Sequence, residues 1–180
     1  MIKPLQIVSQ LDTISFIESE SRTLEYEVGT IVSADGKIVK QYVGSGSLVR
    51  TPMRDLALFV GNVFTHNHPS GRGFTVSDVQ SFALSGASEM RASLPDGTVF
   101  VLRRRASDVA ESLGNILQNE VPEARYPGAA YALQEEISAD GHDLSEEKRD
   151  SRIFDIMAES VHTWLVDNAE EFGYTYSKEE

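Results

Sequence analysis

The sequence contains no cysteine, which excludes disulfide bonds and every metal site that depends on thiolate ligands. It also has no run that approaches the roughly 18 apolar residues of a membrane-spanning helix. The N-terminal region lacks a basic segment followed by an apolar stretch of signal-peptide length. From these absences we expect a soluble cytoplasmic protein with no membrane partner.

Positive charge is scarce as well. The chain has 16 Lys and Arg residues against 28 Asp and Glu residues, which gives a net charge of −12. Binding to phosphate groups needs clustered positive charge, so this balance argues against nucleic acid or an anionic membrane as a partner. The basic cluster Arg103-Arg104-Arg105 is too short to change that conclusion.

What is present indicates a globular chain, because 41% of the 180 residues are hydrophobic and no low-complexity tract interrupts them. Apolar periodicity and turn residues predict helices and strands in alternation over the first 105 residues. The predicted helices are 4–21, 53–61 and 75–86, and the predicted strands are 24–32, 37–43, 62–66, 90–94 and 98–104. Two Asp-Gly turns, Asp35-Gly36 and Asp96-Gly97, predict hairpins. This order predicts an α/β fold with a single mixed sheet and flanking helices.

After Arg105 the pattern becomes helical and acidic. Helices are predicted over 107–119, 129–139 and 146–172, and the last 40 residues hold 11 acidic and 4 basic side chains. Apolar residues recur at helical spacing in the last of these helices, which indicates packing on the sheet or on a second copy of the chain, so an oligomer through this helix is one expectation. The predicted domains are a core over 1–105 and an acidic helical extension over 106–180.

The most informative stretch runs from the strand ending at His66 to the helix start at Asp78. Alternate residues of a strand point to the same side, so His66 and His68 are expected to converge. Pro69, Gly71 and Gly73 allow the backbone to turn back before Asp78. Two imidazoles and a carboxylate match the ligands of a catalytic zinc, with the fourth position left for water.

Each of these residues has a second interpretation. Thr75-Val76-Ser77-Asp78 fits a helix N-cap with an acid at the third helical position, in which Asp78 would only satisfy backbone N–H groups. A single histidine is usually structural or solvated. We favour the metal because two of the four histidines stand here as His-x-His beside a glycine-rich loop. His142 and His162 are interpreted as surface or packing residues.

These residues resemble the signature of the JAMM (JAB/MPN-plus) metalloproteases: an upstream Glu, then His-x-His, then Ser or Thr three residues before Asp. The chain supplies His66-Asn67-His68, Thr75 and Asp78, and its Asn-His-Pro-Ser-Gly segment is most similar to prokaryotic and phage-associated members. The His-to-Asp interval is one residue shorter than in many members, and Thr75 stands where serine is usual. The resemblance covers roughly residues 22–105 and leaves the C-terminal third unexplained.

The resemblance implies the JAB/MPN fold, whose architecture is similar to that of cytidine deaminases, and a Zn²⁺ ion held by His66, His68 and Asp78. It also implies an upstream glutamate as general base. Glu27 fits the family's spacing to the following hairpin better than Glu25, although strand parity alone does not separate the two. Thr75 would donate a hydrogen bond to the oxyanion of the reaction, in competition with its use as an N-cap.

The implied function is a zinc-dependent peptidase or isopeptidase whose substrate is a protein or peptide, including conjugates of ubiquitin-like proteins. A phage or mobile-element origin would suit this resemblance. The alternative is a binding or assembly module that keeps the fold and uses its zinc structurally or not at all. A metal phosphodiesterase is a third interpretation, but it needs basic residues near the site and few are present.

Overall fold

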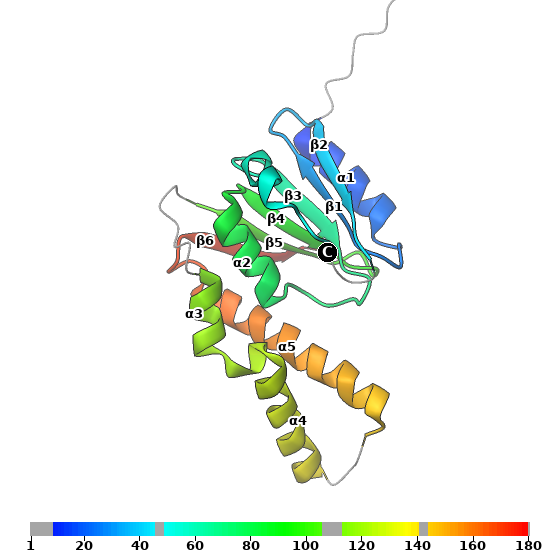
Figure 1. Ribbon diagram of the computed structural model, residues 1–180, viewed down its shortest axis with the longest axis vertical. Coiled ribbons are helices and arrows are strands. Elements are labelled where there is room, and N and C mark those ends of the chain that lie inside the picture. The colour runs from blue at the N-terminus through cyan, green and yellow to red at the C-terminus, as the bar shows by residue number, and fades with distance from the viewer. Residues whose placement is uncertain (1–8, 46–48, 106–112, 141–143, 180) are drawn as a thin grey trace, which may run out of the picture. The chain divides into compact units, whose positions relative to one another are not determined.

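The computed structural model describes residues 9–45, 49–105, 113–140 and 144–179 (Figure 1). Its strands are β1 Val28–Val32, β2 Ile38–Val43, β3 Val63–Asn67, β4 Glu89–Ser93, β5 Val99–Arg104 and β6 Tyr174–Glu179. They form one six-stranded sheet in the order β2-β1-β3-β4-β5-β6. Strand β1 pairs antiparallel with β2 and β3, whereas β3 pairs parallel with β4, so the sheet is mixed. The predicted α/β class with a single mixed sheet and flanking helices is confirmed.

The chain divides into two compact units. The first spans Met1–Gly71, Ser85–Val99 and Glu179–Glu180, and the second spans Arg72–Leu84 and Phe100–Lys178. They are called unit 1 and unit 2 below, and each is described by itself.

Unit 1 begins, in its described part, with α1 (Gln10–Ser21). Ser9 and Asp12 form a capping box at the start of this helix, which satisfies two backbone N–H groups. Ile14 and Ile17 pack against residues of β1 and β3. The predicted helix over 4–21 is therefore observed from Gln10, and its residues 4–8 lie outside the described part of the chain.

The hairpin of β1 and β2 follows. Ser33 donates its backbone N–H to the carbonyl of Lys37, and Gly36 takes a φ of 78°, a conformation that glycine adopts without steric cost. This confirms the turn predicted at Asp35-Gly36. Strand β1 starts at Val28, four residues later than predicted, so Glu25 and Glu27 precede the strand. The predicted helix over 53–61 is a 3₁₀-helix, η1 (Met53–Leu58).

Strand β3 is the central element of unit 1 and lies between β1 and β4. All five of its residues are buried. His66 lies opposite Gly29 of β1 and opposite Ala92 of β4, so small neighbours flank the imidazole-bearing position. The predicted strand over 62–66 is confirmed with a shift of one residue.

Unit 2 contains most of α2 (Val76–Ser85), of β5 and of β6. The ring of Phe82 on α2 packs on Tyr174 of β6, with centroids 5.4 Å apart. Arg104 on β5 donates to the carbonyls of Phe82 and Ala83 and so ties the end of α2 to the strand. Strand β6 was not predicted, and the predicted helix over 146–172 ends at Asn168 instead.

The remaining helices of unit 2 are α3 (Leu113–Glu120), η2 (Pro122–Ala124), α4 (Tyr126–Asp140) and α5 (Glu146–Asn168). Helices α4 and α5 pack on each other through Ala129, Leu133, Ile153 and Ile156 (Figure 1). Residues 107–112 of the first predicted helix lie outside the described part of the chain. None of the helices in the described ranges combines the length and the apolar composition that crossing a membrane requires.

Candidate functional site

The two histidines of the His-x-His motif converge, as predicted. His66 is in β3 and His68 follows its last residue, and their Nε2 atoms lie 2.8 Å apart. Both side chains are buried, with 4% of each residue exposed. The backbone N–H of His68 donates to the carbonyl of Ser93 at 2.9 Å, which extends the pairing of β3 with β4 beyond the end of the strand. Extended backbone through residue 68 therefore places both rings on one side.

The ring of His66 also stacks on Phe64, with centroids 5.4 Å apart and an interplanar angle of 20°. Phe64 in turn lies against the backbone of Gly29. A Cβ atom at Gly29 would stand 2.5 Å from Cζ of Phe64, so a larger residue would displace the ring that supports His66. A glycine in the middle of a strand often marks such a close approach, and this was the available sequence signal.

Asn67 connects β3 to the segment before β1. Its side chain is fully buried, its Nδ2 donates to the carbonyl of Tyr26 at 3.0 Å, and its Oδ1 accepts from the N–H of Val28 at 2.6 Å. These two bonds hold the backbone on both sides of Glu27. No local sequence pattern indicates this role, because the bond to Val28 spans 39 positions of the chain.

Glu27 lies beside the histidine pair. Its Oε1 atom is 3.9 Å from Nε2 of His68, and its Oε2 accepts a hydrogen bond from the backbone N–H of Val49 at 2.8 Å. Only 7% of Glu27 is exposed, whereas Glu25 is an exposed residue. The structure therefore separates two carboxylates that alternation along a strand could not separate.

Thr75 and Asp78 form a capping box at the start of α2. The backbone N–H and the hydroxyl of Thr75 both donate to Oδ2 of Asp78 at 2.7 Å, and the N–H of Asp78 donates to the Thr75 hydroxyl oxygen at 3.3 Å. The N-cap interpretation is thus confirmed. The role of Thr75 as an oxyanion donor stays a prediction, and it would use the hydroxyl proton that Asp78 accepts here.

His66, His68 and Asp78 form one group of side chains suited to a metal ion among the residues that the structure describes. One nitrogen of each imidazole and one carboxylate oxygen lie within 4.8 Å of one another, with both histidines buried and Asp78 half-buried. Two imidazoles and a carboxylate suit zinc and several other first-row metals. Two nitrogen ligands of a tetrahedral zinc would lie about 3.3 Å apart, so the observed 2.8 Å requires a shift of about half an ångström.

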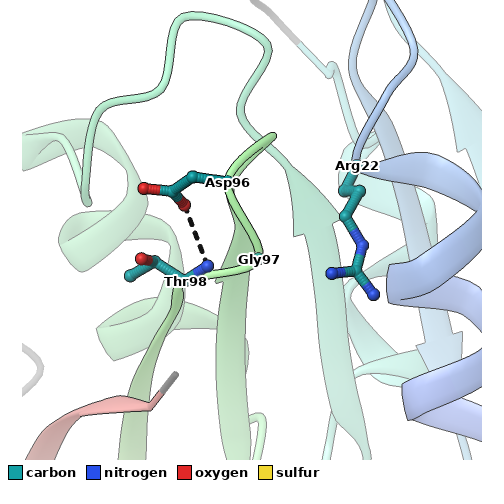
Figure 2. Close-up of a pocket in the computed structure, with 4 residues that line it drawn as sticks. All are labelled: Arg22, Asp96, Gly97 and Thr98. Carbon is teal, nitrogen blue, oxygen red and sulfur yellow. Dashed lines mark hydrogen bonds between the residues drawn. The ribbon is translucent and has the colours of Figure 1, made fainter.

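A shallow cavity of about 500 Å³ also occurs in unit 1, between the end of α1 and the turn that joins β4 to β5. Arg22, Asp96, Gly97 and Thr98 line it. Figure 2 shows that the Arg22 and Asp96 side chains do not point toward each other, and Asp96 accepts from the N–H of Thr98 at 2.9 Å within the turn. This cavity brings together no set of reactive groups, so it is a surface feature of the hairpin.

His162, the third histidine in the described part of the chain, does not join the metal-ligating group. His162 on α5 packs in unit 2, where its Nδ1 lies 2.7 Å from the hydroxyl of Tyr176, and burial lowers the pKa of its ring. This agrees with its interpretation as a packing residue, and His142 lies outside the described part of the chain.

Comparison of the sequence with protein-family models, and of the chain with curated proteins and with solved structures, gave no match.

Proposed function

We propose that the protein is a zinc-dependent hydrolase of the JAMM type that cleaves a peptide or isopeptide bond. The observation that carries the proposal is the buried pair of His66 and His68 beside the Glu27 carboxylate, 3.9 Å from the nearer imidazole. Two nitrogen ligands and an adjacent base are the parts that a metal-activated water needs. Burial of all three side chains keeps their geometry fixed, which supports a chemical role over a solvated surface cluster.

In this proposal His66, His68 and Asp78 hold the zinc. Both imidazoles would bind through Nε2, so each ring would carry its hydrogen on Nδ1. When bound, zinc would lower the pKa of a coordinated water to about 7 and polarise the scissile carbonyl. The hydrogen bonds from Thr75 to Oδ2 of Asp78 orient the third ligand in the manner of outer-shell partners at metal sites.

Glu27 is the proposed general base. It would take the proton of the attacking water and deliver it to the leaving amine. The N–H of Val49 holds Oε2, while Oε1 is the carboxylate oxygen that lies toward His68. Asn67 restrains the backbone on both sides of Glu27, so it acts as a positioning residue for the base.

The substrate class follows from the resemblance and from charge. A protein or peptide is the proposed substrate, including the linkage to a ubiquitin-like protein. A basic or neutral segment would approach a chain of net charge −12 more readily than an acidic one. The low content of Lys and Arg disfavours phosphodiester chemistry on the same metal.

Metal analysis tests the proposal first. After reconstitution with zinc, the wild-type protein should hold about one zinc per chain, as a single mononuclear site requires. The double variant His66→Ala, His68→Ala should lose it, and His142→Ala, a change of a histidine outside the His-x-His motif, should retain it. Full stoichiometry in the double variant would place the metal elsewhere and refute the assignment.

Cleavage assays test the proposed hydrolytic activity. The zinc-loaded protein should hydrolyse at least one member of a panel of peptides and ubiquitin-like fusions, and a chelator should abolish that activity. If zinc binds with the expected stoichiometry and no member is cleaved, the protein is better described as a metal-containing binding or assembly module.

A further inference from the structure

Four residues, Arg72 to Thr75, lead directly into α2 and so into Asp78, the proposed third zinc ligand. Because the N–H and hydroxyl of Thr75 both donate to the Asp78 carboxylate, the position of Thr75 restrains where that carboxylate lies. What holds this segment, called the lead-in segment below, therefore matters for the site. Two sets of contacts within unit 2 anchor it.

The first anchor is the contact of the Arg72 side chain with α5. Its Nε donates to Oδ1 of Asp155 at 2.7 Å, and its Nη2 donates to the carbonyl and the hydroxyl of Ser151 at 3.1 and 3.0 Å. The guanidinium carbon also lies 5.8 Å from the centre of the Phe154 ring. The planar, charged fork of arginine thus bonds to two residues one turn apart on the helix, an arrangement that a point charge such as lysine does not reproduce.

The second anchor is Phe74, of which only 2% is exposed. Its ring packs against Phe100 of β5 and Tyr176 of β6, with centroids 6.4 and 6.3 Å away. His162 of α5 completes this aromatic group through its contacts with the same two rings. Gly73 lets the backbone approach closely, because a Cβ atom there would lie 3.2 Å from two carbons of the Phe100 ring.

We propose that α5 and β6 are positioning elements of the metal site, acting through the lead-in segment. Arg72, Asp155 and Phe74 are then positioning residues, because they contact the segment that presents Asp78. The part of the proposal that concerns metal affinity rests on the proposed function; the part that concerns the order of the segment does not. In this arrangement the C-terminal helical region influences the affinity for zinc, although none of its residues is a proposed ligand.

Helix α5 also provides a matched control. Arg152 forms an ion-pair network of the same chemistry, with Glu136 at 2.9 Å and Glu159 at 3.0 Å, but none of these contacts involves the lead-in segment. Arg152→Ala removes a comparable set of charged hydrogen bonds from the same helix. A general loss of α5 stability would affect this variant and the Arg72 variants alike.

The first measurement uses the full-length protein without metal. Hydrogen–deuterium exchange of peptides covering residues 70–79 should become about 3- to 10-fold faster in Arg72→Ala and in Asp155→Ala, because charged hydrogen bonds that close the segment are lost. Arg72→Lys should fall between wild type and Arg72→Ala. Arg152→Ala should leave this region at the wild-type rate.

The second measurement is the dissociation constant for zinc, read by competition with a chromophoric chelator. Arg72→Ala and Asp155→Ala should weaken binding about 10-fold, as outer-shell changes at metal sites do, while Arg152→Ala should not. Thermal midpoints of all variants separate this effect from global destabilisation. Unchanged exchange over 70–79, or equal effects of Arg152→Ala, would overturn the proposal. Absence of zinc binding in the wild type would refute the proposed function alone, because the exchange experiment would still decide whether the anchors order the segment.

Discussion

Glu25 and Glu27 show how strongly position decides the use of a side chain. They stand two residues apart, yet Glu25 is exposed and Glu27 is buried with a backbone donor on one oxygen and His68 near the other. A buried carboxylate that accepts one fixed hydrogen bond has a defined orientation, which a general base requires. An exposed carboxylate keeps its conformational freedom and its hydration.

Glu27→Gln is therefore expected to lower turnover by about 10²-fold or more, because an amide can accept the bond from Val49 but cannot take a proton from water. Zinc content should remain at the wild-type level, since Glu27 is not a proposed ligand. Glu25→Gln is the matched control and should keep nearly full activity. Loss of activity in the Glu25 variant instead would show that the base is the other carboxylate.

At this scale the sequence predicted part of the site. Alternation along a strand was enough to bring His66 and His68 together, because the extended backbone persists through both residues. It could not separate Glu25 from Glu27, since residues two apart have the same strand parity; in the structure both precede β1, which begins at Val28. The role of Asn67 depends on contacts with Tyr26 and Val28 that no local pattern encodes.

Among the elements, those with a local turn signal were predicted and β6 was not. The β1–β2 hairpin has its Asp-Gly turn within the pair, so sequence alone specifies the partner. Strand β6 has three consecutive β-formers, Tyr174, Thr175 and Tyr176, but its neighbour β5 ends at Arg104, far back in the chain. The helix predicted over 146–172 rests on apolar residues at helical spacing, and these include Phe172, which lies beyond the observed end of α5.

Tyr174 gives a test of how β6 is held. Its ring is fully buried against Phe82, and its hydroxyl has no hydrogen-bond partner in the part of the chain that the structure describes. Burial also raises the pKa of this hydroxyl. A buried hydroxyl without a partner costs about 1–3 kcal/mol, so Tyr174→Phe should raise the free energy of unfolding by about 1 kcal/mol.

Tyr174→Ala is the contrasting variant and should lower the same free energy by about 3–5 kcal/mol through loss of the ring. Urea unfolding followed by the fluorescence of Trp164, the single tryptophan of the chain, measures both. Its indole Nε1 donates to Glu120 and its ring stacks on Phe172, so it reports on unit 2. A Tyr174→Phe variant less stable than wild type would show that the hydroxyl does have a partner.

For the whole molecule, the chain passes from unit 1 to unit 2 at Arg72, returns at Ser85, leaves again at Phe100 and returns at Glu179. Unit 2 is thus built from two separate stretches of sequence, and α2 depends for its packing on residues that lie beyond residue 105, such as Tyr174. The boundary predicted after Arg105 from composition stays a prediction. A change of composition reports the local character of the chain, whereas side-chain contacts such as this one decide what can fold alone.

Truncation after Arg105 tests that boundary directly. The fragment 1–105 would lack Tyr174 and Tyr176 and would expose Phe82 and Phe100, so we expect aggregation or a markedly lower melting temperature than that of the full chain. Light scattering and thermal melting by circular dichroism measure these outcomes. A soluble fragment that melts at the temperature of the full chain would establish 1–105 as an independent domain.

The long separation of β5 and β6 also has a kinetic consequence. Sixty-nine residues, 105–173, lie between these neighbouring strands, whereas 33–37 alone join β1 to β2. Closing the longer loop costs about 2 kcal/mol more in chain entropy, so this pairing is expected late in folding, after the helices between the strands have formed and shortened the effective loop. Arg91, which binds Glu18 and Glu89 as well as Glu179, would then meet its last carboxylate only when the sheet is otherwise complete. The overall rate of refolding should accordingly decrease when the α4–α5 contact is weakened. The rate at which the β1–β2 hairpin forms should stay the same.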